Sequence, residues 1–134
     1  MARFLRSISV ELKLTNINNG NSFQFADVPQ LKGMYVQGIE AFTAAEVAKT
    51  PTQTPIIADA AKNGILVNFV EDNLTKYENI PYFTLIAKEN AGLIREFKNY
   101  KVNINKSGVY IGDNAALVAN TSVFFTFYYT EKPI

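Results

Sequence analysis

The sequence predicts an all-β protein, an antiparallel two-sheet sandwich or a barrel of about eight short strands with little helix. Two observations carry this prediction. Apolar and polar residues alternate along most segments, as they do in half-buried strands. Turn-forming residues such as Asn, Gly and Pro separate those segments at intervals of 8 to 15 residues. No internal repeat or linker divides the chain, so residues 1–134 are interpreted as one domain.

The first strand is predicted at residues 7–14, which read SISVELKL. Every second position there is Ile, Val or Leu, and the positions between are serine or charged, so one face of the strand is apolar. A turn follows at the Asn-Gly pair of residues 19–20, because this dipeptide favours positive φ. Phe23 and Phe25 flank a glutamine in a short second strand, and Pro29 then interrupts the chain.

A longer third strand is predicted at residues 33–44. Simple alternation places Ile39 on one of its faces and Val36 on the other. Gly38 lies inside this strand and indicates a bulge or the close approach of another backbone. The residues that follow are rich in Thr and Pro, so we expect one long exposed loop at about 45–62.

The second half of the chain continues the strand pattern after an Asn-Gly turn at residues 63–64. The next strand alternates clearly, and the one after it contains a proline that weakens its first part, so its firm part is predicted to begin at Tyr82. The strands predicted in this half lie at residues 65–71, 77–87, 96–108, 107–112 and 122–130.

The last predicted strand, residues 122–130, contains the densest aromatic cluster of the chain, FFTFYY. One of its faces is wholly apolar and is predicted to be core, since aromatic and β-branched side chains bury a large area. The residues on that face are Val123, Phe125, Phe127 and Tyr129. The other face mixes Phe124 and Tyr128 with two threonines, and we expect a loop or another subunit to cover it in part.

Composition limits the classes of function. The chain has 13 Lys and Arg against 12 Asp and Glu, so it lacks the basic excess of a dedicated nucleic-acid or membrane-surface protein. It has neither cysteine nor histidine, which excludes disulfides and argues against a structural zinc site. No apolar stretch reaches the length of a membrane span. We therefore expect no cofactor, no metal, no specific nucleic-acid binding and no membrane span.

Enzymatic chemistry would have to rest on carboxylates alone. The chain has no histidine, the commonest general base, and no cysteine, the most readily activated nucleophile. The adjacent Glu71 and Asp72 end a strand and are interpreted as a solvated turn. The remaining carboxylate candidates are Glu40, Glu46, Asp59 and Glu78. None of them shows a spacing that indicates a catalytic pair, so we expect that the protein is not an enzyme.

Contacts with other proteins are expected from three parts of the chain. Residues 1–6 are expected to form an N-terminal arm that is either solvated or docked on a neighbouring subunit. The half-polar face of the last strand is the second part that we expect to contact another subunit. The candidate subunit-interface residues in these two parts are Arg3, Phe4, Arg6, Phe124 and Tyr128. The long loop supplies a candidate partner-contact segment, which consists of Thr50, Pro51, Thr52, Gln53, Thr54 and Pro55.

The order of features over residues 33–130 resembles a known family. A long strand with GIEAFT is followed by a Pro/Thr-rich loop and by the strand ILVNFV. A strand with Ile80, Pro81 and Leu85 comes next, and the aromatic FFTFYY strand comes last. This order resembles small jelly-roll virion proteins of tailless icosahedral bacteriophages, in particular the vertex (penton) proteins that stand beside double jelly-roll major capsid proteins.

The resemblance implies a single jelly roll of eight strands that assembles as a symmetric ring, with a pentamer expected, in a virion capsid. The implied partners are other copies of the chain, the major capsid protein and a spike protein. The implied location is the virion, after synthesis in the host cytoplasm. The alternative is a lectin-like or receptor-binding sandwich module of a phage spike, for which Tyr110, Asp113 and Asn114 are candidate glycan contacts.

Overall fold

A computed structural model describes residues 5–42, 64–71, 76–87, 90–115, 117 and 120–134. These residues form eight β-strands and short 3-10 helices, with no α-helix among them. The strands are β1 (Arg6–Leu14), β2 (Ser22–Gln24), β3 (Tyr35–Phe42), β4 (Ile65–Val70), β5 (Lys76–Pro81), β6 (Arg95–Tyr100), β7 (Gly108–Ile111) and β8 (Thr121–Thr130). The 3-10 helices include η1 (Pro29–Leu31), η2 (Tyr82–Leu85) and η4 (Ile104–Lys106).

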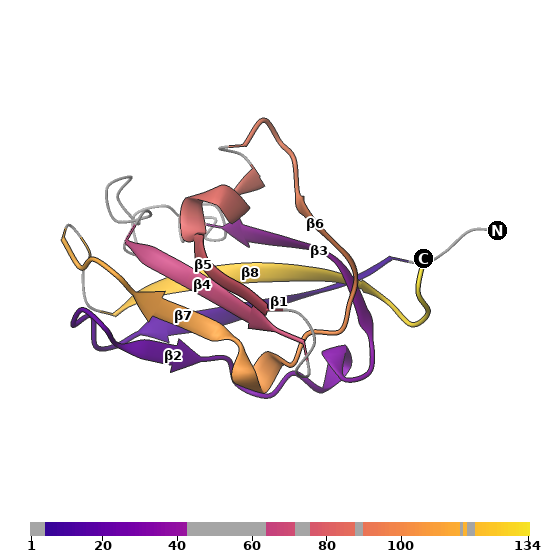
Figure 1. Cartoon of the computed structure of the whole chain (residues 1–134), viewed down its shortest axis with the longest axis horizontal. Helices are drawn as coiled ribbons and strands as arrows, with labels where there is room; N and C mark the ends of the chain where they lie inside the picture. The colour runs from indigo at the N-terminus through magenta and orange to yellow at the C-terminus, as the bar shows by residue number, and fades with distance from the viewer. Residues whose placement is uncertain (1–4, 43–63, 72–75, 88–89, 116, 118–119) are drawn as a thin grey trace, which may run out of the picture.

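The strands lie in two four-stranded sheets, in the orders β1-β8-β3-β6 and β2-β7-β4-β5. Neighbouring strands are antiparallel in both sheets. Figure 1 shows the two sheets as two layers, with β4, β5 and β7 lying over β8 and β3. The predicted antiparallel two-sheet sandwich of eight strands is therefore confirmed.

The strand pairing follows a mirror rule along the chain. β1 pairs with β8, β2 with β7, β3 with β6 and β4 with β5, so each strand of the first half pairs with its counterpart counted from the other end. One long hairpin folded at the β4–β5 connection would contain these four pairs. Two further pairings, β3 with β8 and β4 with β7, arise when such a hairpin is rolled so that its pairs alternate between two sheets.

Aromatic side chains from both sheets meet in the core. Phe125 of β8 packs edge-to-face against Phe25, with ring centroids 5.3 Å apart, and Phe127 packs in the same way against Phe69 of β4 at 6.0 Å. Aromatic pairs prefer this geometry. The four side chains predicted on the core face of β8 are at most 6% exposed, so that prediction is confirmed.

β3 contains the bulge that its glycine predicts. The register of β3 with both neighbouring strands shifts between Val36 and Gly38. The extra residue reverses the alternation, so Val36 and Ile39 both lie in the core and are 0% exposed. The prediction that put them on opposite faces is therefore wrong. A Cβ added at Gly38 would lie 3.2 Å from the Ile94 side chain, so the glycine also lets this neighbour pack closely.

The strand predicted at residues 77–87 is wrong in its second half. β5 ends at Pro81, and η2 begins at the next residue. The Thr84 hydroxyl donates a hydrogen bond to the Pro81 carbonyl at 2.7 Å, which suits a tight turn rather than an extended strand. Tyr82 is nevertheless fully buried, and its hydroxyl donates to the carbonyl of Phe42.

The strand predicted at residues 96–108 ends early, at Tyr100. Asn99 adopts a positive φ of 49°, which is outside the strand region of backbone conformation. Beyond it, Val102 and Ile104 are still buried. The alternation therefore identified the buried side chains correctly but overestimated the length of the strand.

Candidate functional site

The candidate subunit interface is the outer face of β8, meaning the side of its sheet that points away from the core. Phe124 and Tyr128 lie on this face and are half-buried. Thr126 and Thr130 are only 6% and 5% exposed, although they also point away from the core. Side chains of the neighbouring strands β1 and β3 therefore cover much of this face within a single chain.

Hydrogen bonds between side chains cross this face from strand to strand. The hydroxyls of Ser9 and Thr126 lie 2.7 Å apart, which joins β1 to β8. The Ser122 hydroxyl donates to the Glu11 carboxylate at 2.5 Å and joins the same two strands again. Such cross-strand pairs hold the side chains of the face in fixed positions.

Apolar groups lie at two places along this face. Phe124 of β8 is opposite Phe42 of β3, and both rings are half-buried. Tyr128 and Ile94 approach each other over Gly38, since both side chains lie within 4.0 Å of where a Cβ on that glycine would be. Ile94 is 39% exposed. The outer face of β8 thus combines a rigid polar centre with an apolar group on each side of it.

Tyr128 is tied to Glu40 of β3 on this face. Its hydroxyl donates a hydrogen bond to the Glu40 carboxylate at 2.9 Å. Burial raises the pKa of Tyr128, and the hydrogen bond and negative charge of Glu40 raise it further. Because its pKa is higher in the folded state than the usual value of about 10, this tyrosine contributes stability that is complete below pH 10. That contribution is lost as the pH rises through the folded-state pKa.

We expect Glu40→Gln to lower the pKa of Tyr128 toward the ordinary tyrosine value, because it removes the neighbouring charge. A titration of tyrosinate absorbance will measure this, with Tyr128→Phe identifying which component belongs to Tyr128. The matched control is Glu11→Gln, which neutralises another carboxylate of this face that bonds a serine instead. An unchanged titration of Tyr128 in Glu40→Gln would contradict the assignment.

Arg6, the remaining predicted interface residue that the structure describes, does not lie on this face. Arg6 begins β1 on the side of the sheet that faces the core. Its guanidinium forms an ion pair with Glu131 at 2.8 Å, and both side chains are 55% exposed, so the pair contributes little stability. Arg3, Phe4 and the loop segment 50–55 lie outside the residues that the structure describes.

Two acidic candidates that the structure describes, Glu40 and Glu71, are not brought together either. Glu40 lies on β3 and Glu71 follows β4, so they belong to different sheets. Glu71 accepts a hydrogen bond from the backbone N–H of Lys101 at 2.9 Å. Glu46, Asp59 and Asp72 lie outside the described residues. Within the described ranges, no group of three Asp or Glu residues is placed to hold a metal ion, and no helix has the length and apolar character needed to cross a membrane.

The candidate glycan contacts lie at the end of β7, where they shape a turn. Tyr110 is half-buried in β7. The Asp113 carboxylate accepts a hydrogen bond from the N–H of Ala115 at 3.0 Å, and the N–H of Asn114 donates to the Asn19 side chain at 2.8 Å. Both interactions are typical of Asx turns and connections between loops.

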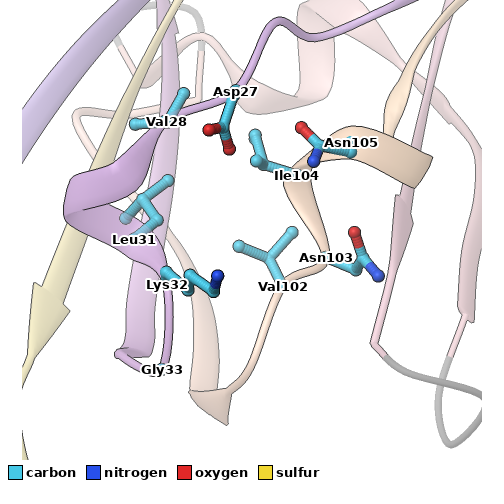
Figure 2. Close-up of a pocket in the computed structure, with 9 residues that line it drawn as sticks. All are labelled: Asp27, Val28, Leu31, Lys32, Gly33, Val102, Asn103, Ile104 and Asn105. Atoms are coloured by element: carbon cyan, nitrogen blue, oxygen red, sulfur yellow. The ribbon is translucent and has the colours of Figure 1, made fainter.

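Sequence reasoning missed a cleft of about 350 Å³ between η1 and η4. Figure 2 shows apolar side chains between polar ones, with Ile104 between Asp27 and Asn105. The apolar lining residues are Val28, Leu31, Val102 and Ile104, and the others are Asp27, Lys32, Gly33, Asn103 and Asn105. Such a cleft has room for a small apolar group flanked by hydrogen-bonding groups. No local motif indicates it, because its two walls are about 70 residues apart in the sequence.

Comparisons with protein-family models, with curated proteins and with solved structures find no match to this chain. What the protein does must therefore be inferred from its own residues and strand order.

Proposed function

We propose that the protein is a structural virion protein, a single jelly roll of the vertex or penton type that assembles as a symmetric ring beside a major capsid protein. The observation that carries this proposal is the mirror pairing of the strands. A jelly roll is an eight-stranded hairpin rolled into two sheets, which requires these four pairs and their alternation between the sheets. The virion assignment rests on the resemblance of residues 33–130 to small jelly-roll virion proteins.

Proteins with a jelly-roll fold have many different functions, so the fold alone does not indicate assembly into a ring. A surface suited to contact between subunits is needed as well. The outer face of β8 supplies such a surface. Protein interfaces combine aromatic anchors with polar groups whose hydrogen bonds are satisfied, and this face has Phe124 and Tyr128 on either side of bonded hydroxyls. In a ring, subunits contact head to tail, so this face meets a different patch on the next subunit.

We expect Phe124→Lys to weaken association of the subunits by about tenfold or more, because a charge would replace an aromatic anchor at the interface. Sedimentation velocity over a range of protein concentrations will measure the change. The matched control is Tyr110→Lys, which makes the same kind of change at a half-buried aromatic residue of the other sheet. Thermal unfolding of both variants checks that they are folded.

The Tyr110→Lys control shows whether weaker association comes from loss of a specific interface or from adding a charge anywhere on the surface. If Tyr110→Lys weakens association as much as Phe124→Lys does, the outer face of β8 is not the contact surface. If neither variant changes the association of a protein that does self-assemble, the ring contact lies elsewhere.

A further inference from the structure

β1 is an edge strand whose pairing with β8 is regular along its whole length. It lies at the end of its sheet, and its nine residues pair with β8 without interruption from Arg6 to Leu14. Among the described residues, no strand pairs with its other side. An edge of this kind presents a row of backbone N–H and C=O groups that can pair with a further strand.

The other sheet edges are protected in ways that β1 is not. β2 has three residues. β5 contains Pro81, which lacks an N–H, and its register with β4 is irregular. The register of β6 with β3 shifts at the bulge. Short strands, prolines and bulges all prevent pairing between edges, so β1 is the edge most open to an added strand.

The core-side residues of β1 are incompletely covered. Ile8, Val10 and Leu12 pack against the core but remain partly exposed, whereas Leu14 at the end of the strand is fully buried. A strand added beside β1 would cover apolar side chains of this row with its own alternating residues. The free backbone edge and the partly exposed apolar row therefore both fit the same kind of partner, a β-strand with apolar residues at alternate positions.

We infer that β1 pairs antiparallel with β1 of a second copy of this chain, in a register centred on Leu12. A two-fold axis perpendicular to the sheet would then join two four-stranded sheets into one of eight strands, with the apolar rows of both copies on the same side. In this register Leu12 is opposite Leu12 of the second copy, and Val10 is opposite Leu14. Residues 10–14 of the two β1 strands therefore pair and cover Val10 and Leu12, whereas Ile8 lies beyond the paired segment.

Charge complementarity selects this register. Glu11 and Lys13 lie on the outward side of β1, two residues apart and both exposed. Pairing centred on Leu12 puts each Glu11 opposite a Lys13 of the other copy, so two cross-strand ion pairs form while one oxygen of each Glu11 carboxylate keeps its hydrogen bond from Ser122. Pairing centred on Glu11 would oppose two glutamates, and pairing centred on Val10 would leave both charges opposite serines.

The β1 contact is separate from the contact that closes the proposed ring, and it does not require the ring to form. A ring is closed by head-to-tail contacts, whereas the β1 contact is two-fold and uses a different surface. The β1 contact would link a member of one ring to a copy outside that ring. Each contact can therefore be tested while the other is absent.

A cysteine introduced at the two-fold axis tests the contact directly, because the chain has no cysteine of its own. Residues directly opposite in an antiparallel pair have Cβ atoms about 4.5–5.5 Å apart, close enough for a disulfide after small adjustments. We expect mild oxidation of Leu12→Cys to give a disulfide-linked dimer. Ser9→Cys is the matched control on the same strand, since the register places it opposite Thr15, and it should cross-link at least about tenfold less.

Charge reversal then tests the register. In the Leu12→Cys protein, adding Glu11→Lys or Lys13→Glu alone would oppose like charges twice and should lower the cross-linking yield by about tenfold. Mixing these two single-charge variants should restore cross-linking between unlike chains, because opposite charges then face each other at both positions. Lys76→Glu on β5, which lies on the other sheet, should leave the yield unchanged.

Four results would overturn the inference. Equal cross-linking of Ser9→Cys and Leu12→Cys would indicate random collision, and cross-linking of Val10→Cys in place of Leu12→Cys would reject the register. Failure of the mixture to exceed its separate components would show that Glu11 and Lys13 do not pair. Loss of cross-linking in the Phe124→Lys background would show that the β1 contact depends on the ring surface.

Discussion

Replacing Phe125 by alanine is expected to lower the free energy of unfolding by about 3–5 kcal/mol. The side chain is 0% exposed in the middle of β8. Its ring packs edge-to-face against Tyr82 at 5.6 Å and against Phe69 of the second sheet at 6.5 Å, so its removal opens a cavity between the two sheets. Urea denaturation followed by circular dichroism will measure the loss.

Phe124→Ala is the matched control, one residue away on the other face of the same strand. Phe124 is half-buried and faces away from the core, so we expect this variant to lose about 1 kcal/mol. Both substitutions remove the same atoms from the same strand. Equal losses in the two variants would contradict the assignment of the core face, and a larger loss in Phe124→Ala would reverse it.

Gly108→Ala is expected to destabilise the protein by about 3 kcal/mol. A Cβ at this position of β7 would lie 2.0 Å from the carbonyl oxygen of Phe23 and 2.9 Å from the Cα of Gln24. Both are backbone atoms of β2, so no change of rotamer relieves the overlap, and the β2–β7 pairing must shift. Chemical denaturation will measure the loss, and amide hydrogen exchange will show whether it is concentrated in β2 and β7.

Gly112→Ala provides the control for Gly108→Ala. There the nearest atom to the new Cβ is a methyl group of the Leu66 side chain, at 3.1 Å, and a flexible side chain can move aside. We expect a loss below about 1 kcal/mol for Gly112→Ala. If the two alanine variants were equally stable, β2 would not approach β7 as closely as the structure shows.

The sandwich was predictable because alternation in single strands decides which side chains are buried. β8 shows this best, since every second residue from Val123 to Tyr129 is apolar and at most 6% exposed. Strand boundaries were less predictable. Residues 82–87 have a composition typical of a strand, yet the hydrogen bond from Thr84 to Pro81 favours a 3-10 turn. Gly38 indicated a bulge in the third strand. It did not indicate that the shift in register would place the Val36 side chain on the core face.

The candidate interface was predictable only in part. Alternation alone placed Phe124 and Tyr128 on one face. It could not show that Tyr128 bonds to Glu40, because those residues are 88 positions apart and meet only through the β3–β8 pairing. The cleft between η1 and η4 was hidden for the same reason. The edge position of β1 also depends on strand order, which alternation does not specify.

Native mass spectrometry of the purified protein tests the central claim, assembly as a closed ring, most directly. The proposal predicts a species at one fixed multiple of the 14.9 kDa chain, with five copies expected, or complexes of several such rings. The β1 contact by itself gives dimers, so the two contacts are told apart by mass. A protein that remains monomeric or dimeric at the highest concentrations tested, and that binds no capsid protein, would contradict the proposed function.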